Sequence, residues 1–149
     1  MISEDYFFSF SKSDLNISAD DIADVINSGS IPNNLDYRSQ VIDILGEIPE
    51  IGDYRGQLTV FPNPQFDDEK YILTVNNISF RLNKVLYNEM RGSEMVAFFI
   101  CTAGNIYSDL SRKYMGKGDY LKGYILDVAG SVAVEKIACL IHSKLSQSV

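Results

Sequence analysis

The stretch MVAFFICTAGN, residues 95–105, joins an uncharged apolar run to a glycine-containing turn. Positions 95–101 are all apolar, a length typical of a buried strand and too short for a helix that spans a membrane. The turn that follows predicts the start of a helix running to Met115. We therefore expect a buried central strand that leads directly into a helix.

Downstream of this stretch the sequence predicts one long helix over residues 119–145. No proline interrupts it, and Gly116 and Gly118 break the chain just before it. Gly123 and Gly130 each disfavour a helix by about 1 kcal/mol relative to alanine. They lie seven residues apart, nearly on one face, which indicates close packing against another backbone.

Upstream, shorter apolar patterns alternate with turn residues. A loop is expected at 32–34 and a turn at Asn76-Asn77. Ser18 and Asp36 are candidate helix caps. The patterns predict strands over residues 6–10, 58–61 and 71–75. They predict helices over residues 20–26, 36–46 and 78–90. The helix over 36–46 carries Val41, Ile42 and Leu45 and is ended by Gly46. Helices, then strands, then helices indicate an α+β fold whose strands pair through short turns.

Length and composition are those of a globular chain. The 149 residues predict one domain, and 46% hydrophobic with 22% charged residues is near the average. The formal net charge of −7 disfavours nucleic acid and suits cationic ligands or basic partner surfaces. Because the sequence shows no membrane-spanning run and no secretory start, we expect a cytoplasmic protein with Cys101 and Cys139 reduced.

The long helix carries a polar stripe. At 100° per residue its members fall within an arc of about 80°; they are Asp127, Ser131, Glu135 and His142. We expect this stripe to border the buried arc, which holds Leu126, Val134, Ile137, Leu140 and Ile141. A carboxylate at such a border favours a cationic partner. Pairing with an internal lysine or arginine, or simple exposure to water, is the alternative.

Two other groups of residues are candidates for chemistry. The turn Thr102-Ala103-Gly104 places backbone N–H groups at a helix start, where anions can bind, although many such turns only connect elements. Cys101 and His142 are a conceivable nucleophile and base, but a cysteine at the end of an apolar run favours a buried structural thiol. A single histidine excludes a histidine-rich metal site.

The segments 96–105 (VAFFICTAGN), 118–127 (GDYLKGYILD) and 130–135 (GSVAVE) together resemble a known family. They are similar to the activation (reactivation) domain of cobalamin-dependent methionine synthase, and more so to its small stand-alone relatives. The shared pattern is an apolar strand ending in Thr-x-Gly, then Gly-Asp before a helix that carries Gly-Ser-x-Ala-Val-Glu. The similarity is tight over residues 96–145 and looser over 57–91.

The resemblance implies a single domain over residues 1–149, with flanking helices on a twisted, mainly antiparallel sheet. It also implies binding of S-adenosylmethionine and docking over a corrinoid domain whose cobalamin has been oxidised. An electron from a flavoprotein and a methyl group from S-adenosylmethionine then restore methylcobalamin. Glu135 aligns with a glutamate that contacts the ligand in the family, and His142 aligns with the histidine after it.

Two departures from the family qualify these expectations. The Arg-x-x-x-Gly-Tyr segment that follows this helix in the family is missing here, as is the corrinoid-ligating Asp-x-His-x-x-Gly motif. We therefore expect cobalamin to be held only by a partner, and the chain to act as an accessory module that is not catalytic alone. The expected ligand-binding residues are Glu135, Asp127, Ser131, His142, Thr102 and Gly104.

Two alternatives stay open at this point. The first is an interaction module that docks on a corrinoid protein without binding S-adenosylmethionine. The second is an unrelated cysteine-dependent hydrolase, which requires an exposed Cys101.

Overall fold

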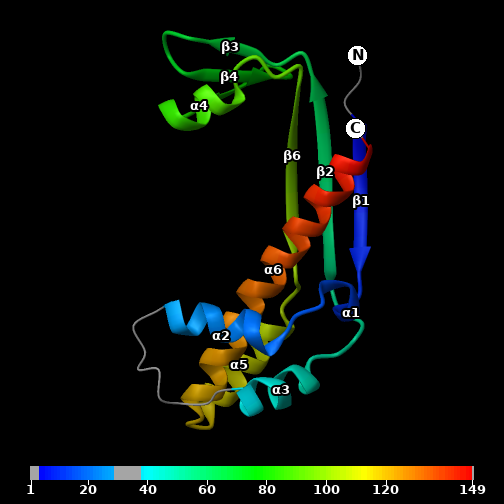
Figure 1. Cartoon of the computed structure of the whole chain (residues 1–149), viewed down its shortest axis with the longest axis vertical. Helices are drawn as coiled ribbons and strands as arrows, with labels where there is room; N and C mark the ends of the chain where they lie inside the picture. Colours follow the sequence, from blue (N-terminus) through cyan, green and yellow to red (C-terminus); the bar gives the residue numbers. More distant parts are fainter. Residues whose placement is uncertain (1–3, 29–37, 149) are drawn as a thin grey trace. The chain divides into compact units, whose positions relative to one another are not determined.

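The computed structural model describes residues 4–28 and 38–148 and is α+β (Figure 1). The predicted loop at 32–34 and the predicted cap Asp36 lie outside the described residues. The strands are β1 (Glu4–Phe10), β2 (Tyr54–Pro62), β3 (Gln65–Asp67), β4 (Ile72–Val75), β5 (Ile78–Arg81) and β6 (Met95–Thr102). The helices are α1 (Lys12–Leu15), α2 (Ala19–Ser28), α3 (Arg38–Glu47), α4 (Lys84–Met90), α5 (Ile106–Gly116) and α6 (Tyr120–Ser148). The predicted fold class and long last helix are confirmed.

The strands form two three-stranded sheets. One has the order β1-β2-β6, and the other is an antiparallel meander, β3-β4-β5, in which Gln65 faces Thr74 and Ile72 faces Arg81. The chain divides into two compact units, the first made of Met1–Phe7 with Gln57–Ile100 and the second of Phe8–Gly56 with Cys101–Val149. Both units include parts of β1, β2 and β6, and a single domain over 1–149 stays a prediction.

The first unit has a small aromatic core. Tyr87 of α4 is buried and contacts the rings of Phe66 and Tyr71 edge-on. Its hydroxyl donates a 2.8 Å hydrogen bond to Asp68, and burial together with that carboxylate raises the pKa of Tyr87 to about 12. The meander is therefore fixed to α4 by packing and by one polar contact.

The second unit is built around α6, which packs most extensively on α5. A Cβ added to Gly123 would clash with Met115 Cγ and lie 3.1 Å from the Ser111 carbonyl oxygen, and one added to Gly130 would lie 2.9 Å from Tyr107 Cβ. The hydroxyl of Ser111 also donates to the Gly123 carbonyl at 2.8 Å. The predicted close packing against another backbone is thus confirmed at Gly123, whereas at Gly130 the close neighbour on α5 is the Tyr107 side chain.

Helices α2 and α3, which contact α6, agree only in part with what the sequence predicts. Ser18 caps α2 as predicted, because its hydroxyl accepts from the Asp21 N–H while the Asp21 carboxylate accepts from the Ser18 N–H. In α3, which carries the predicted apolar residues, Val41 and Ile44 are buried but Ile42 is 59% exposed. Gly46 lies inside α3 and does not end it.

The predicted helix over 78–90 is wrong in its first third. Residues 78–81 form β5, and only 84–90 are helical, capped by Asn83, whose side chain accepts from the Leu86 N–H. Asn76 and Asn77 have φ of 49° and 64°. Two consecutive left-handed residues favour a tight hairpin, so β4 turns directly back into β5. Strand β3 was not predicted.

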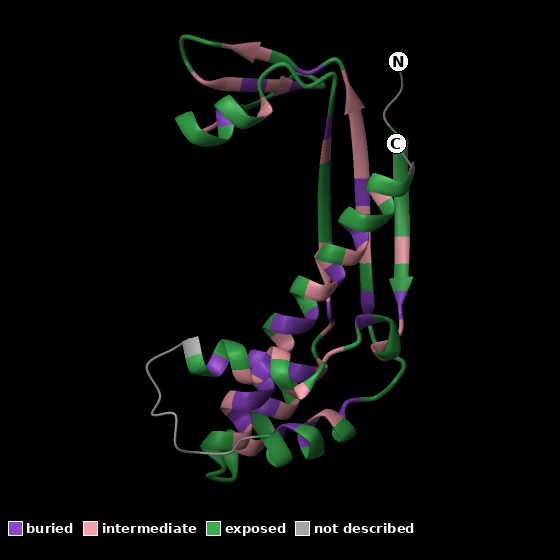
Figure 2. Ribbon diagram, in the orientation of Figure 1, coloured by how far each residue is buried: buried purple, intermediate pink, exposed green. Residues whose placement is uncertain are grey.

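Strand β6 forms where predicted, but it is neither central nor buried. It lies at the edge of its sheet, since β2 lies between it and β1. Val96 is buried with Leu73 and Val75, whereas Phe99 is 51% and Ile100 72% exposed. Figure 2 shows the exposed class along much of this strand. Apolar continuity indicated the strand correctly, but a sheet of only three strands leaves its edge uncovered.

Candidate functional site

The polar stripe on α6 is exposed at all four positions: Asp127, Ser131, Glu135 and His142. It borders the buried arc as expected, since Leu126, Ile137 and Ile141 are buried, although Val134 is 39% exposed. Val128 and Val132, on the other flank of the stripe, are buried as well. Helices α1, α2, α3 and α5 all contact α6, so its buried arc is wider and centred differently from the one that apolar spacing predicts.

A cavity of about 420 Å³ lies between this stripe and the turn after β6. Its lining residues are Ala103, Gly104, Tyr107, Ser108, Asp127, Gly130, Ser131 and Val134. It thus brings together three predicted site residues, Gly104, Asp127 and Ser131. The volume falls within the range of about 300–1,000 Å³ that small-molecule sites occupy.

The turn that forms one wall is held in an unusual conformation. Gly104 has φ of +69°, and its N–H donates to Thr102 Oγ1 at 3.0 Å. A Cβ on Gly104 would lie 2.8 Å from the Asp53 Cβ. Thr102 therefore supports the turn and does not line the cavity. The turn leads into α5, whose cap Asn105 makes no side-chain capping bond and whose first turn contributes Ser108.

Asp127 is the single charged residue among those that line the cavity. It takes part in no ion pair with the described part of the chain, and the nearby Ser131 hydroxyl donates to the Asp127 backbone carbonyl at 3.4 Å, leaving the carboxylate free of that contact. One free carboxylate beside the hydroxyls of Ser108 and Ser131 can bind a cation that also carries hydrogen-bonding groups.

Glu135 lies outside this cavity, in a neighbouring groove of about 240 Å³. That groove is lined by Asp21, Val25, Val132, Glu135, Lys136 and Cys139. Lys136 is paired with Asp21 at 3.0 Å, and Glu135 forms no ion pair within residues 4–28 and 38–148. His142 lines neither the cavity nor the groove. The structure therefore does not bring Glu135 and His142 together with Asp127.

Ser108 and Tyr107 are lining residues that sequence reasoning missed. Tyr107 is 3% exposed and packs on Gly130. Its hydroxyl is buried near Tyr54, and burial, together with that neighbour, raises the pKa of Tyr107 well above the usual value. Helix periodicity from Gly104 would have indicated Ser108, which follows one turn later.

Cys101 does not have the surroundings of a nucleophile. It is half-buried, its thiol donates to the Val134 carbonyl at 3.8 Å, and burial raises the pKa of the thiol. His142 follows Val134 by eight residues, about 12 Å along the helix. The structure thus gives no support to a Cys101–His142 pair.

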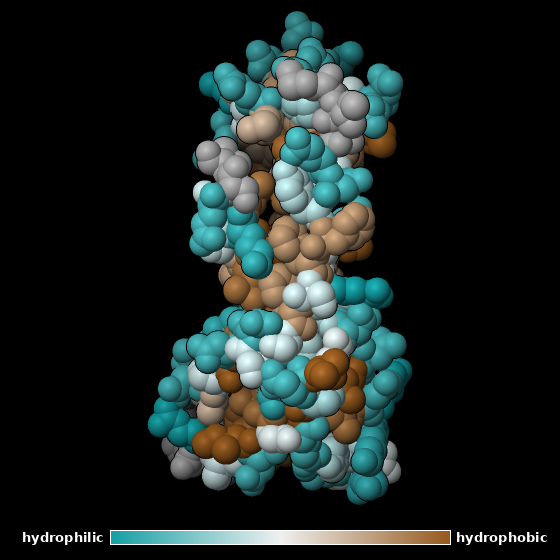
Figure 3. Space-filling view, turned by 90° about the vertical axis from the view of Figure 1, so that its right-hand side faces the viewer, coloured by the Kyte–Doolittle hydropathy of each residue, from teal (hydrophilic) through white to brown (hydrophobic). Residues whose placement is uncertain are grey.

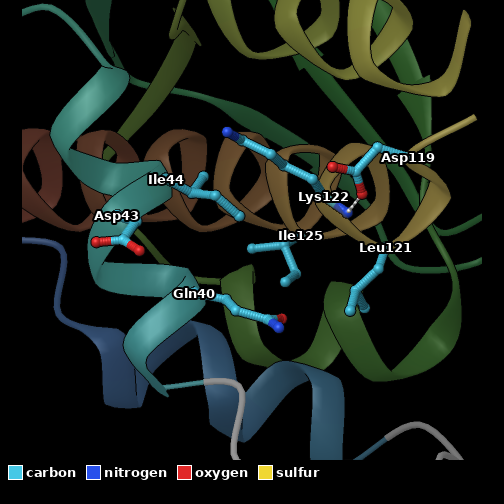
Figure 4. Close-up of a pocket in the computed structure, with 7 residues that line it drawn as sticks. All are labelled: Gln40, Asp43, Ile44, Asp119, Leu121, Lys122 and Ile125. Atoms are coloured by element: carbon cyan, nitrogen blue, oxygen red, sulfur yellow. Dashed lines mark hydrogen bonds between the residues drawn. The ribbon is translucent and has the colours of Figure 1, made fainter. Parts of the chain in front are cut away.

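A further cavity, of about 200 Å³, lies between α3 and the start of α6 (Figure 4). Asp119 accepts from the Lys122 N–H at 3.1 Å there. The Lys122 ammonium is already paired with Glu47 and lies 4.0 Å from the centre of the Tyr114 ring. This cavity is smaller than the Asp127 cavity, and its one cation is engaged by the protein itself.

Comparison with known proteins gives no assignment: no protein-family model matches the chain, and neither does any curated protein. Within the described residues there is no cluster of three or more potential metal ligands and no helix both long and apolar enough to cross a membrane.

Proposed function

We propose that this chain is an accessory module for reactivation of a corrinoid-dependent methionine synthase or related methyltransferase, and that the Asp127 cavity binds S-adenosylmethionine. The observation that carries the proposal is the composition of the cavity walls. Gly104 comes from the Thr-x-Gly turn, and Asp127, Gly130 and Ser131 come from the helix segments that carry the family resemblance. Segments distant in sequence thus meet at one cavity.

The residues present suit this ligand. S-adenosylmethionine carries a sulfonium and an ammonium group as well as hydroxyls, and the cavity offers one carboxylate and two serine hydroxyls. A charge-assisted contact contributes about 1.5–3 kcal/mol, with exposed groups at or below the lower end because water and salt screen them. Asp127 is exposed, so we expect modest affinity.

In this proposal the residues of the chain bind and orient, and their partners supply the rest. S-adenosylmethionine supplies the methyl group when bound. Asp127 holds the positive end of the ligand, while Ser108 and Ser131 position its polar groups. The cobalamin is held by a corrinoid partner protein, a flavoprotein supplies the electron, and the cytoplasm is the expected compartment.

The first prediction concerns Asp127. Replacing it with asparagine (Asp127→Asn) removes the charge at nearly constant shape, so we expect S-adenosylmethionine to bind several-fold more weakly by titration calorimetry. If Asp127 faces the sulfonium, the wild type should also prefer S-adenosylmethionine over S-adenosylhomocysteine, which keeps the ammonium but lacks the sulfonium charge, and the variant should lose that preference. Glu89→Gln, an exposed carboxylate on α4, is the matched control and should bind normally.

Glu135 provides the contrast that locates the site. The resemblance assigns a ligand contact to Glu135, whereas the geometry favours Asp127. We expect Asp127→Asn to weaken binding more than Glu135→Gln does. If Glu135→Gln abolishes binding and Asp127→Asn has no effect, the ligand occupies the neighbouring groove and the assignment to the Asp127 cavity is wrong.

A second candidate function is an interaction module that docks on a corrinoid protein without binding S-adenosylmethionine. The exposed apolar side chains of β6 favour it, because a surface of this kind is typical of protein interfaces. Co-purification with a corrinoid protein, together with an unchanged melting temperature in S-adenosylmethionine, would support this function and contradict the first.

A further inference from the structure

The outer edge of β6 differs from the other sheet edges of the described chain. Edge strand β1 begins with Glu4 and Asp5, β3 ends with Asp67, and β5 ends with Arg81. Strand β6, MVAFFICT, has eight residues and neither charge nor proline. Charges and prolines on edge strands prevent pairing with another chain. The edge of β6 is therefore the one that lacks this protection.

The side chains of β6 also expose apolar surface. Met95 is 49%, Phe99 51% and Ile100 72% exposed. Since a large apolar side chain covers about 150–250 Å² when fully exposed, these three with Phe98 offer about 400 Å² in each copy. Elsewhere, hydrophobic side chains also reach the surface among hydrophilic ones, as on the face in Figure 3; on β6 they coincide with an open strand edge.

We propose that two copies of this chain associate by antiparallel pairing of their β6 edges over residues 95–100, related by a two-fold axis. The pairing strand must itself be exposed, apolar and uncharged, and β6 of a second copy has these properties at equal concentration. A symmetric contact of one edge with itself closes after two copies. The β1 edges left at the outside carry Glu4 and Asp5, which discourages further addition.

The geometry of a two-fold pair suits these side chains. With the axis perpendicular to the sheet, Phe98 and Ile100, which alternate onto one face, meet the same residues of the second copy on that face. The Phe98 ring is already held between Phe80 and Phe61, at centroid distances of 5.0 and 5.9 Å. A ring ordered in advance loses little entropy on association.

Charge also favours the antiparallel arrangement. Glu94 directly precedes β6, and Ala103, Gly104 and Asn105 follow it. Antiparallel pairing places each Glu94 near the uncharged end of the other strand, whereas parallel pairing would bring the two carboxylates together. The area is below the roughly 1,600 Å² of a standard interface, so we expect a dimer with a micromolar dissociation constant.

Sedimentation equilibrium of the full chain between about 1 and 200 µM tests the proposal. The wild type should change from monomer to dimer in this range. Ile100→Lys places a charge on the edge and should weaken the dimer at least about tenfold. Val85→Lys, at a 74% exposed position on α4, is the matched control and should dimerise like the wild type. Circular dichroism establishes that both variants fold.

Hydrogen exchange locates the interface. Amide exchange over residues 95–100 should slow as protein concentration rises, because their outward N–H groups then pair. A wild type that stays monomeric throughout the range overturns the proposal, even if it captures another protein by this edge. Dimerisation that Ile100→Lys leaves unchanged, or that gives no concentration-dependent protection at β6, overturns it equally.

Discussion

Gly104 is the residue that most tightly determines the shape of the candidate site. Its positive φ disfavours any side chain, and the approach of Asp53 leaves no room for one. These are independent causes, one in the backbone and one in the packing. A substitution here therefore combines two penalties.

Gly104→Ala should lower the free energy of unfolding by at least about 2 kcal/mol, from backbone strain and overpacking together. Urea denaturation measures the change. Gly46→Ala is the matched control: Gly46 lies in α3 at negative φ, and a Cβ there meets nothing within 4 Å. It should stabilise the chain by up to about 1 kcal/mol. Equal effects of both substitutions would contradict this account.

At the residue scale the sequence indicated much of the site but not its grouping. Helical spacing identified Asp127 and Ser131, and the Thr-x-Gly turn identified Gly104. The same spacing placed Glu135 with them. Glu135 lies two turns beyond Asp127, and the lining residue of α6 farthest along the chain is Val134, so Glu135 faces the groove next to α2 instead. The reach of a cavity along a helix depends on the neighbouring elements, which periodicity does not describe.

At the scale of single elements, α2 depends on its N-terminal cap. The Ser18 hydroxyl accepts from the Asp21 N–H at 3.1 Å. Ser18→Ala should destabilise the chain by about 0.5–2 kcal/mol, because that N–H loses its partner. Thermal unfolding measures the loss, and Ser143→Ala, an exposed position within α6, should change stability by less than about 0.5 kcal/mol. If both variants lose the same amount of stability, the Ser18 cap has no special role.

The wrong predictions for residues 78–81 and for β6 share one cause. Residues 78–90 fit helical spacing, yet the turn at Asn76 and Asn77 directs residues 78–81 back along β4. The apolar run of β6 fits a central strand, yet β2 takes the central place. In both cases partner strands decide the outcome, and a local pattern does not contain the order of strands in a sheet.

At the scale of the whole molecule, acid should reduce the stability of the second unit before that of the first. Hydrogen bonds to Ser11, Ser18, Lys122 and Ser13 are the largest causes that lower the pKa of Asp14, Asp21, Glu47 and Glu50, respectively. All four carboxylates belong to the second unit. A lowered folded-state pKa gives stability that is present above the unfolded pKa and is lost as pH falls through the folded pKa.

We therefore expect the free energy of unfolding to fall as pH drops below about 4.5, with hydrogen exchange in the second unit rising first. Urea denaturation at neutral and acidic pH measures the fall. Glu47→Gln should make it smaller, since Glu47 pairs with Lys122 only while it is ionised and loses that pairing when acid protonates it. Exchange that rises first in the first unit would contradict the prediction.

The two cysteines differ in a way that gives the protein an intrinsic reporter position. Cys101 is half-buried, and burial raises the pKa of its thiol, which disfavours the reactive thiolate. Cys139 is exposed in the groove that is also lined by Glu135. Alkylating dyes at neutral pH should therefore modify Cys139 selectively. A fluorophore attached there would sense occupation of that groove directly, without an engineered attachment point.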